Sequence, residues 1–236
     1  DIKDIILCGK RNYGSSIKTA FFSSGNTIIM KTKDLVEIFN YTKELFPNLK
    51  RIPVYGSSQY IVKKGLEEMK SISEAGLSRI HVGLESGDDV VLDRVKKGSN
   101  SKIHIKAGEI LKKTDIELSE YIVLGLGGKD RSNEHIKKTI EVLNKINPDF
   151  IRIRTFLPKI NTPILEEIKN KTFQILSPHE ILKETFDLIS GLEVNSIVVS
   201  DHYTNYIRID GKLPDDKKNM IDQINQALKR DESSFR

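Results

Sequence analysis

The chain has 236 residues, of which 38% are hydrophobic and 30% are charged, and it contains one cysteine. This length can bury one large core, so we expect a single domain over residues 1–230 followed by a loose tail over 231–236. One cysteine excludes a disulfide scaffold, and no stretch approaches the roughly 18 apolar residues of a membrane span. These features predict a cytoplasmic enzyme domain that does not bind a membrane.

The net charge of +5 does not by itself indicate a nucleic-acid partner. Basic residues are distributed in pairs along expected helices, as in Lys63-Lys64 and Lys137-Lys138. Solvated helix faces account for this distribution better than a nucleic-acid groove does.

Short β-rich runs alternate along the chain with segments of helical periodicity. We expect strands at Ile17–Phe22, Lys50–Tyr55, Arg79–Leu84, Leu118–Leu124 and Phe150–Phe156. The clearest helices are expected at Asp34–Phe46, at Pro178 to about Ser190 and at Asp215–Lys229. The second begins with a capping box, in which Ser177 is the cap and Glu180 its partner. The alternation predicts a parallel sheet covered by helices.

Turns at the carboxyl ends of these strands carry the candidate site residues, because ligands of parallel α/β folds bind at that end. Ser24, Gly25 and Asn26 form the first such turn, and ordinary turn chemistry is the alternative explanation for them. In RIHVGLES, alternation places Ile80, Val82 and Leu84 on one face and His81, Gly83 and Glu85 on the other. We expect Glu85 to point toward the ligand and His81 to be an interior, hydrogen-bonded histidine.

The strand in SEYIVLGLGG ends in a glycine-rich turn. Tyr121 shares the face of Gly125, and Gly127 follows two residues later. A phosphate loop is not indicated, because neither GxxxxGK[ST] nor GxGxxG is present. Phe156 ends the next strand and is a candidate apolar wall.

Several motifs in order resemble the radical S-adenosylmethionine superfamily, in the branch similar to oxygen-independent coproporphyrinogen oxidase. They are FFSSGNTIIMKTKDL, HVGLESGDDVVLDRVKKG, LGLGGKDRSNEH and SDHYTNYIRIDGKLPDDK. The resemblance implies an α/β fold, an incomplete (β/α)6 radical-SAM-type TIM-like barrel. We expect its first strand and cluster loop to be absent and a helical extension to follow at the carboxyl end.

The same resemblance implies roles for the residues at the strand ends. Ser24, Gly25 and Asn26 match the segment that meets the amino group of S-adenosylmethionine. Glu85, followed by Ser86, matches the position that accepts the ribose hydroxyls, with a helix-capping role as the alternative. Lys97 matches a basic residue that pairs with the ligand's carboxylate, although a solvated helix end explains it equally well.

Three further residues match positions on the nucleoside side of the ligand. Tyr121 corresponds to a polar residue that touches the ribose, with a core tyrosine as the alternative. Gly125 and Gly127 correspond to glycines that let the backbone approach the adenine. Phe156 is expected against the purine.

The family also binds a 4Fe-4S cluster through CxxxCxxC after its first strand, and this chain has only Cys8. One thiolate cannot hold a cubane cluster, and we expect Cys8 to be a small buried residue of the first helix. The cluster ligands are expected in a segment that would precede Asp1.

The resemblance implies reductive cleavage of S-adenosylmethionine to methionine and a 5′-deoxyadenosyl radical. With the help of an electron donor, this radical would act on a small-molecule or unknown substrate. Two alternatives stay open: a cluster-free barrel or scaffold that binds an adenosine ligand, and an unrelated barrel enzyme using Glu85 as a general base. Asp201, His202 and Tyr206 either line a substrate site or form a structural turn.

Overall fold

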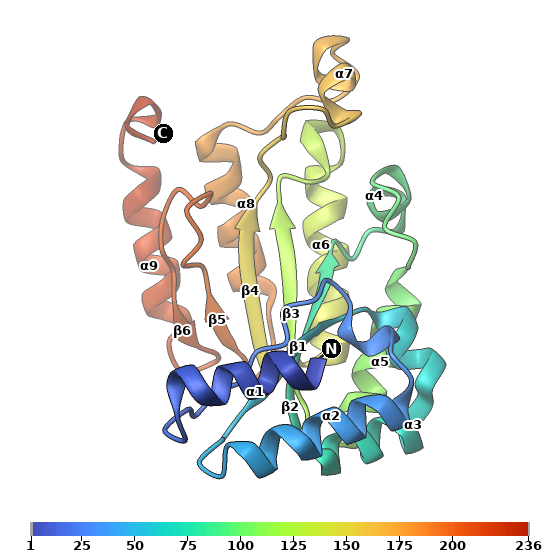
Figure 1. Cartoon of the computed structure of the whole chain (residues 1–236). Helices are drawn as coiled ribbons and strands as arrows, with labels where there is room; N and C mark the ends of the chain where they lie inside the picture. The colour runs from blue at the N-terminus through green and yellow to red at the C-terminus, as the bar shows by residue number, and fades with distance from the viewer. Residues whose placement is uncertain (1, 236) are drawn as a thin grey trace. The chain divides into compact units, whose positions relative to one another are not determined.

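The computed structural model describes residues 2–235 (Figure 1). The helices are α1 (Ile2–Tyr13), α2 (Thr32–Leu45), α3 (Ser58–Ala75), α4 (Asp89–Arg94), α5 (Ser101–Leu111), α6 (Gly128–Ile146), α7 (Ile164–Lys169), α8 (Pro178–Gly191) and α9 (Lys217–Leu228), with 3-10 turns η1 (Thr27–Ile29) and η2 (Glu232–Ser234). The strands are β1 (Ile52–Gly56), β2 (Leu77–Glu85), β3 (Glu117–Leu124), β4 (Phe150–Thr155), β5 (Ile197–Val199) and β6 (Gly211–Lys212).

The strands follow one another in the sheet in chain order, from β1 to β6, and within residues 2–235 the sheet does not close into a barrel. β1 pairs with β2 and β4 with β5 in parallel, whereas β5 and β6 are antiparallel. The expected α/β fold with a predominantly parallel sheet is therefore confirmed.

Contacts divide the chain into two compact units. Unit 1 comprises residues 1–82 and 106–119, and unit 2 comprises residues 83–105 and 120–236. β2 and β3 each contribute residues to both units. The single domain expected over residues 1–230 stays a prediction.

In unit 1, α2 packs against both α1 and α3. Its buried face consists of Leu35, Ile38, Phe39 and Thr42, the face that the sequence predicts. Each large aliphatic or aromatic side chain buried in this way stabilises the fold by about 1.5–3 kcal/mol before the entropy cost is counted.

The expected strand at Ile17–Phe22 is present only as two isolated parallel bridges, Thr19 with Arg51 and Phe22 with Val54. The backbone N–H groups of Ala20 and Phe22 donate to the carbonyls of Arg51 and Pro53, at 3.0 and 3.2 Å. The segment therefore runs beside β1 without a continuous ladder, and the prediction of a regular strand is wrong there.

In unit 2, α6 and α8 pack on each other, and Figure 1 shows α8 behind β4. The capping box of α8 is present, with Glu180 N donating to Ser177 Oγ at 3.3 Å and Ser177 N donating to Glu180 Oε2 at 2.7 Å. The helix begins and ends within one residue of the predicted bounds.

The tail that the sequence predicts to be loose includes η2. Glu232 Oε1 accepts hydrogen bonds from Ser177 Oγ at 2.5 Å and from His179 N at 2.8 Å, and Phe235 is only 9% exposed. These contacts attach the described part of the tail to the beginning of α8.

Candidate functional site

β2 ends in a residue with unusual backbone geometry. The predicted alternation is present, because Ile80, Val82 and Leu84 are at most 1% exposed while Gly83 and Glu85 are half-buried. Glu85 has φ of 61°, in the left-handed region that residues other than glycine seldom adopt. Such strained backbone costs of order 1–3 kcal/mol and is concentrated at functional sites.

The side chain of Glu85 turns back over the strand and pairs with Lys97. Lys97 Nζ lies 2.9 Å from Glu85 Oε1, and both side chains are about one quarter exposed. A methyl group on Gly83 would lie 2.1 Å from that carboxylate oxygen and 2.8 Å from the ammonium nitrogen. The ion pair therefore occupies space that exists only because residue 83 is glycine.

The turn after β2 is attached to α6 by buried hydrogen bonds. Ser86 is 0% exposed, and its Oγ lies 2.8 Å from His135 Nδ1 and accepts from Asp88 N at 3.0 Å. Gly87 N donates to Thr139 Oγ1 at 2.9 Å. Ser86 thus satisfies its hydroxyl within the protein, and its expected contact with the cofactor stays a prediction.

His135 connects this turn to β3. Its Nε2 lies 3.1 Å from the carbonyl oxygen of Val123, so Nε2 carries a proton and Nδ1 accepts the Ser86 hydroxyl. Burial lowers the pKa of His135 to about 4, which keeps the imidazole neutral and preserves this arrangement near neutral pH. A neutral histidine therefore sets the positions of the ends of β2 and β3 relative to each other.

Asp88 fixes the same turn from the other side. Its carboxylate is fully buried and accepts from Arg131 Nη2 at 2.6 Å, from Lys138 Nζ at 2.9 Å and from Val90 N at 3.2 Å. Burial opposes ionisation, but the hydrogen bonds from Lys138 and Arg131 outweigh it and lower the pKa of Asp88. Asp88 is therefore both the N-cap of α4 and the anchor of the turn on α6.

The turn after β3 has an anchor of its own. Gly125 has φ of 76°, and its N–H donates to Glu184 Oε2 at 2.7 Å. The other oxygen of Glu184 accepts from Ser132 Oγ at 2.6 Å. Burial raises the pKa of Glu184 to about 7, so this carboxyl changes its charge in the neutral range.

Gly125 and Gly127 are each required by the packing around this turn. A methyl group on Gly125 would lie 2.7 Å from Ile181 Cδ1 and would require a strained φ. Gly127 has φ of −72°, but a methyl group there would lie 2.9 Å from His135 Cβ. Their expected role beside adenine stays a prediction. Independently of any ligand, the packing of the turn requires glycine at both positions.

Behind the site, in unit 2, lies a buried acid. His104 Nδ1 and Glu120 Oε1 are 3.9 Å apart, and both side chains are 1% exposed. Burial raises the pKa of Glu120, and this effect outweighs the opposing effect of the neighbouring His104. The second oxygen of Glu120 has no hydrogen-bond partner among the described residues.

Tyr121 is half-buried, and the guanidinium groups of Arg154 and Arg152 lie over its ring at 4.8 and 5.7 Å. Phe156 packs edge-on against Phe173, with ring centroids 5.6 Å apart. Neither arrangement tests the nucleoside contacts expected of Tyr121 and Phe156.

In unit 1, the turn at Ser24–Asn26 is accessible. Ser24 and Gly25 are exposed, and no atom lies within 4 Å of a methyl group placed on Gly25. Asn26 Nδ2 donates to Ser57 Oγ at 3.1 Å, whereas its buried Oδ1 has no hydrogen-bond partner among residues 2–235. An unsatisfied amide oxygen fits an expected partner such as an ammonium group.

His81, which was expected to be an interior histidine, packs in unit 1 against the rings of Phe21 and Tyr55, with centroids 5.9 and 5.6 Å away.

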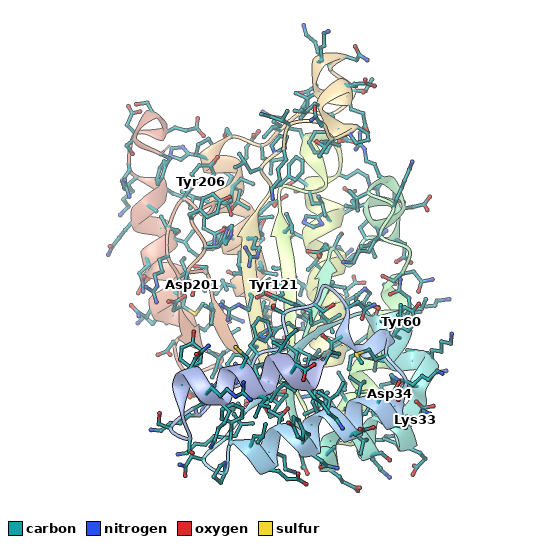
Figure 2. All side chains as sticks on the ribbon, in the orientation of Figure 1. Lys33, Asp34, Tyr60, Tyr121, Asp201 and Tyr206 are labelled. Carbon is teal, nitrogen blue, oxygen red and sulfur yellow. The ribbon has the colours of Figure 1, made fainter. Side chains whose placement is uncertain are left out.

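The candidates Asp201, His202 and Tyr206 lie in unit 2, where Figure 2 labels Asp201 and Tyr206. Asp201 Oδ1 lies 3.4 Å from Arg152 Nη2, and Tyr206 packs on Phe235 with centroids 6.0 Å apart.

Cys8 lies on α1 and is exposed, so the expectation that it is buried is wrong. The helix turns Ile6 inward and leaves Cys8 on the other side, where Asn12 Nδ2 is 3.4 Å from Sγ. Among the described residues, no group of three or more His, Cys, Asp or Glu side chains could hold a metal ion. The donors among residues 2–235 therefore do not fit a 4Fe-4S cluster.

Comparison with known proteins decides the family. A family model described as the radical SAM superfamily matches residues 3–143, which is more than half of the chain. The chain belongs to the radical SAM superfamily. This membership confirms the resemblance and removes the alternative of an unrelated barrel enzyme.

Two curated relatives match about half of the chain. One is the protein MJ0785 of Methanocaldococcus jannaschii, 26% identical over 126 residues that make up 52% of this chain and 33% of the relative. The other is the tRNA-2-methylthio-N(6)-dimethylallyladenosine synthase of Sulfurihydrogenibium sp. (strain YO3AOP1), 26% identical over 129 residues, 54% of this chain and 27% of the relative. The matched region is thus a third or less of each relative.

Two solved structures share the fold. Elp3 of the archaeon Methanocaldococcus infernus gives a TM-score of 0.64 at 14% identity, with 100% of this chain and 59% of that chain covered. Coproporphyrinogen III oxidase (HemN) of Escherichia coli, a radical SAM enzyme, gives a TM-score of 0.62 at 14% identity, with 80% of this chain and 44% of that chain covered.

Within residues 2–235, no helix is both long and apolar enough to cross a membrane.

Three anchoring residues were not predicted from the sequence: Asp88, His135 and Glu184. Asp88 carried a signal, because it directly follows the LESG turn and precedes an apolar helix start, as an N-cap does. Glu184 lies 59 residues from Gly125, so no local pattern could connect the two.

Proposed function

We propose that this chain binds S-adenosylmethionine and is the cofactor-binding part of a radical SAM enzyme. Glu85 is proposed to accept the ribose hydroxyls and Lys97 to bind the methionine carboxylate. Within this superfamily S-adenosylmethionine supplies radical chemistry together with a reduced iron–sulfur cluster, for which this chain lacks the ligands.

The backbone of Glu85 is the observation that carries the proposal. A glutamate with left-handed backbone geometry is costly in free energy. Capping of the following helix α4 does not explain this cost, because Asp88 is the N-cap of that helix. The strain instead turns the carboxylate back over Gly83, where it meets Lys97. An acceptor and a cation placed together and partly exposed suit a ligand that carries both hydroxyl and carboxylate groups.

The ion pair does not prevent this function. Pairs that are accessible to water are worth about 0–1 kcal/mol, whereas a hydrogen bond to a charged group contributes about 1.5–3 kcal/mol. A ligand that bonds both side chains therefore compensates for separating them. The cluster-free alternative, an adenosine-binding scaffold, predicts binding of adenosine without a contribution from Lys97.

The test is calorimetric titration of the intact chain with S-adenosylmethionine and with its decarboxylated analogue. We expect Lys97→Gln to lower the affinity for S-adenosylmethionine by about ten-fold or more, and the affinity for the decarboxylated analogue by less than about two-fold. Lys96→Gln is the matched control, because Lys96 is the exposed neighbour of Lys97. Equal affinity of wild type for both ligands would contradict the carboxylate contact, and absence of binding would contradict the proposal as a whole.

A further inference from the structure

β4 places two arginines on one face of the sheet. Ile151 and Ile153 are at most 2% exposed on one side of the strand, whereas Arg152 and Arg154 alternate with them on the other. Both guanidinium groups lie over the ring of Tyr121, at 5.7 and 4.8 Å from its centroid. We name Tyr121, Arg152 and Arg154 the arginine–tyrosine cluster; Figure 2 shows Tyr121 on β3.

The positive charge of this cluster is poorly balanced. Among the described residues, no carboxylate forms an ion pair with Arg154. Arg152 has one acidic partner, Asp201, at 3.4 Å, and the two side chains are 25% and 48% exposed. Exposed pairs of this length contribute about 0–1 kcal/mol, so Asp201 does not hold Arg152 firmly.

The neighbourhood adds positive charge rather than removing it. Burial lowers the pKa of His202, and the charges of Arg154 and, to a smaller extent, Lys159 lower it further, against the opposing effect of Asp201. His202 therefore lies close enough to Arg154 to experience its positive charge. Two arginines held side by side repel each other, and this repulsion favours an anion that binds both.

We propose that the arginine–tyrosine cluster binds an oxyanion of the substrate, a carboxylate or a phosphate group. This proposal rests on the proposed function in one respect only, namely that the bound anion belongs to the substrate of the enzyme. The ring of Tyr121 supports both guanidinium groups through cation–π contacts. Their N–H groups can donate in pairs to an anion once Arg152 leaves its weak pair with Asp201. Paired N–H donors match the spacing of two oxygens in either group, so the shared chemistry is the oxyanion.

The test uses inorganic phosphate and succinate as separate probes, titrated into the intact chain at constant ionic strength. Binding is followed by NMR of the arginine Nε–Hε groups, with the Arg154 signal assigned from Arg154→Lys. We expect a saturable shift of that signal with at least one probe. Arg154→Gln should weaken the affinity by about ten-fold or more.

Arg208→Gln is the matched control. It removes the same charge from an exposed side chain of unit 2 that pairs with Asp210, outside the cluster. We expect it to change the affinity by less than about two-fold, because the charge of a largely exposed side chain is screened by salt. Arg154→Lys, which keeps the charge and loses the paired donors, should bind more weakly than wild type and more tightly than Arg154→Gln.

The preferred probe identifies the class of oxyanion, since phosphate and succinate differ in geometry and charge. No saturable shift with either probe, or equal weakening by Arg154→Gln and Arg208→Gln, would overturn the proposal. Neither probe contains adenosine or methionine, so a negative result here leaves the titration with S-adenosylmethionine unaffected. Should Arg154→Gln not fold, the wild-type shift and Arg154→Lys decide the question.

Discussion

Lys97 Nζ lies 2.9 Å from Glu85 Oε1, so the two residues proposed to bind opposite ends of one ligand hold each other in its absence. The pair lies over Gly83, where a methyl group would overlap both side chains. Glu85 and Lys97 are thereby kept on the accessible face of β2 at little cost in free energy, because partly exposed ion pairs are weak. This arrangement prepares the site for a ligand without closing it.

Gly125→Ala is expected to destabilise the unliganded protein. The positive φ of 76° costs alanine about 1–2 kcal/mol, and the new methyl group would press on Ile181 Cδ1. The measurement is the free energy of unfolding in urea. Gly25→Ala is the control, because nothing lies within 4 Å of its added methyl group, and it should change stability by less than about 0.5 kcal/mol. Equal effects of the two substitutions would show that the turn after β3 does not need its glycine.

Asp88→Ala is expected to cost about 2–3 kcal/mol of unfolding free energy, since it removes hydrogen bonds from Arg131, Lys138 and Val90 to a buried carboxylate. Asp93→Ala removes an exposed aspartate from the same helix and should cost less than about 0.5 kcal/mol. Thermal unfolding of the three proteins at one pH compares them. A loss at Asp88 as small as that at Asp93 would refute the anchoring role.

Glu184 is expected to make stability fall as pH rises. Its pKa is about 7 in the folded protein and about 4.5 when unfolded, so the folded state binds the extra proton between these values. The stabilisation is therefore complete below pH 4.5 and is lost as pH rises through 7. The shift corresponds to roughly 3 kcal/mol.

Glu184→Gln isolates this contribution, because His135 and other groups also titrate. The unfolding free energy of wild type minus that of Glu184→Gln should decrease between pH 5 and pH 8. A difference that is constant with pH would mean that burial does not perturb the Glu184 carboxyl.

Local patterns sufficed for much of the fold. Alternation in RIHVGLES identified the buried face of β2, and the Ser177–Glu180 capping box located the beginning of α8. The segment Ile17–Phe22 was harder, because its β-rich composition does not reveal that only two residues form bridges with neighbours. Cys8 was placed wrongly because its apolar neighbours suggested a buried face that α1 does not extend to it.

The candidate site was predictable only in part. Glu85 follows from strand alternation, but its positive φ and its pairing with Lys97 depend on a turn whose geometry no sequence pattern states. The anchors His135 and Glu184 come from distant helices and act through hydrogen bonds to turns. Long-range contacts of this kind follow from the packed fold and have no local signature.

The most direct test of the account is the ribose contact of Glu85. Wild type and Glu85→Ala are titrated calorimetrically with S-adenosylmethionine and with its 2′-deoxyadenosyl analogue. Alanine keeps the same backbone strain, so only the carboxylate is removed. We predict that the substitution weakens binding of S-adenosylmethionine by about 1.5–3 kcal/mol, roughly ten- to 150-fold in affinity. Binding of the deoxy analogue should be weakened by much less. Equal losses for both ligands, or none for either, would contradict the claim that Glu85 binds the ribose.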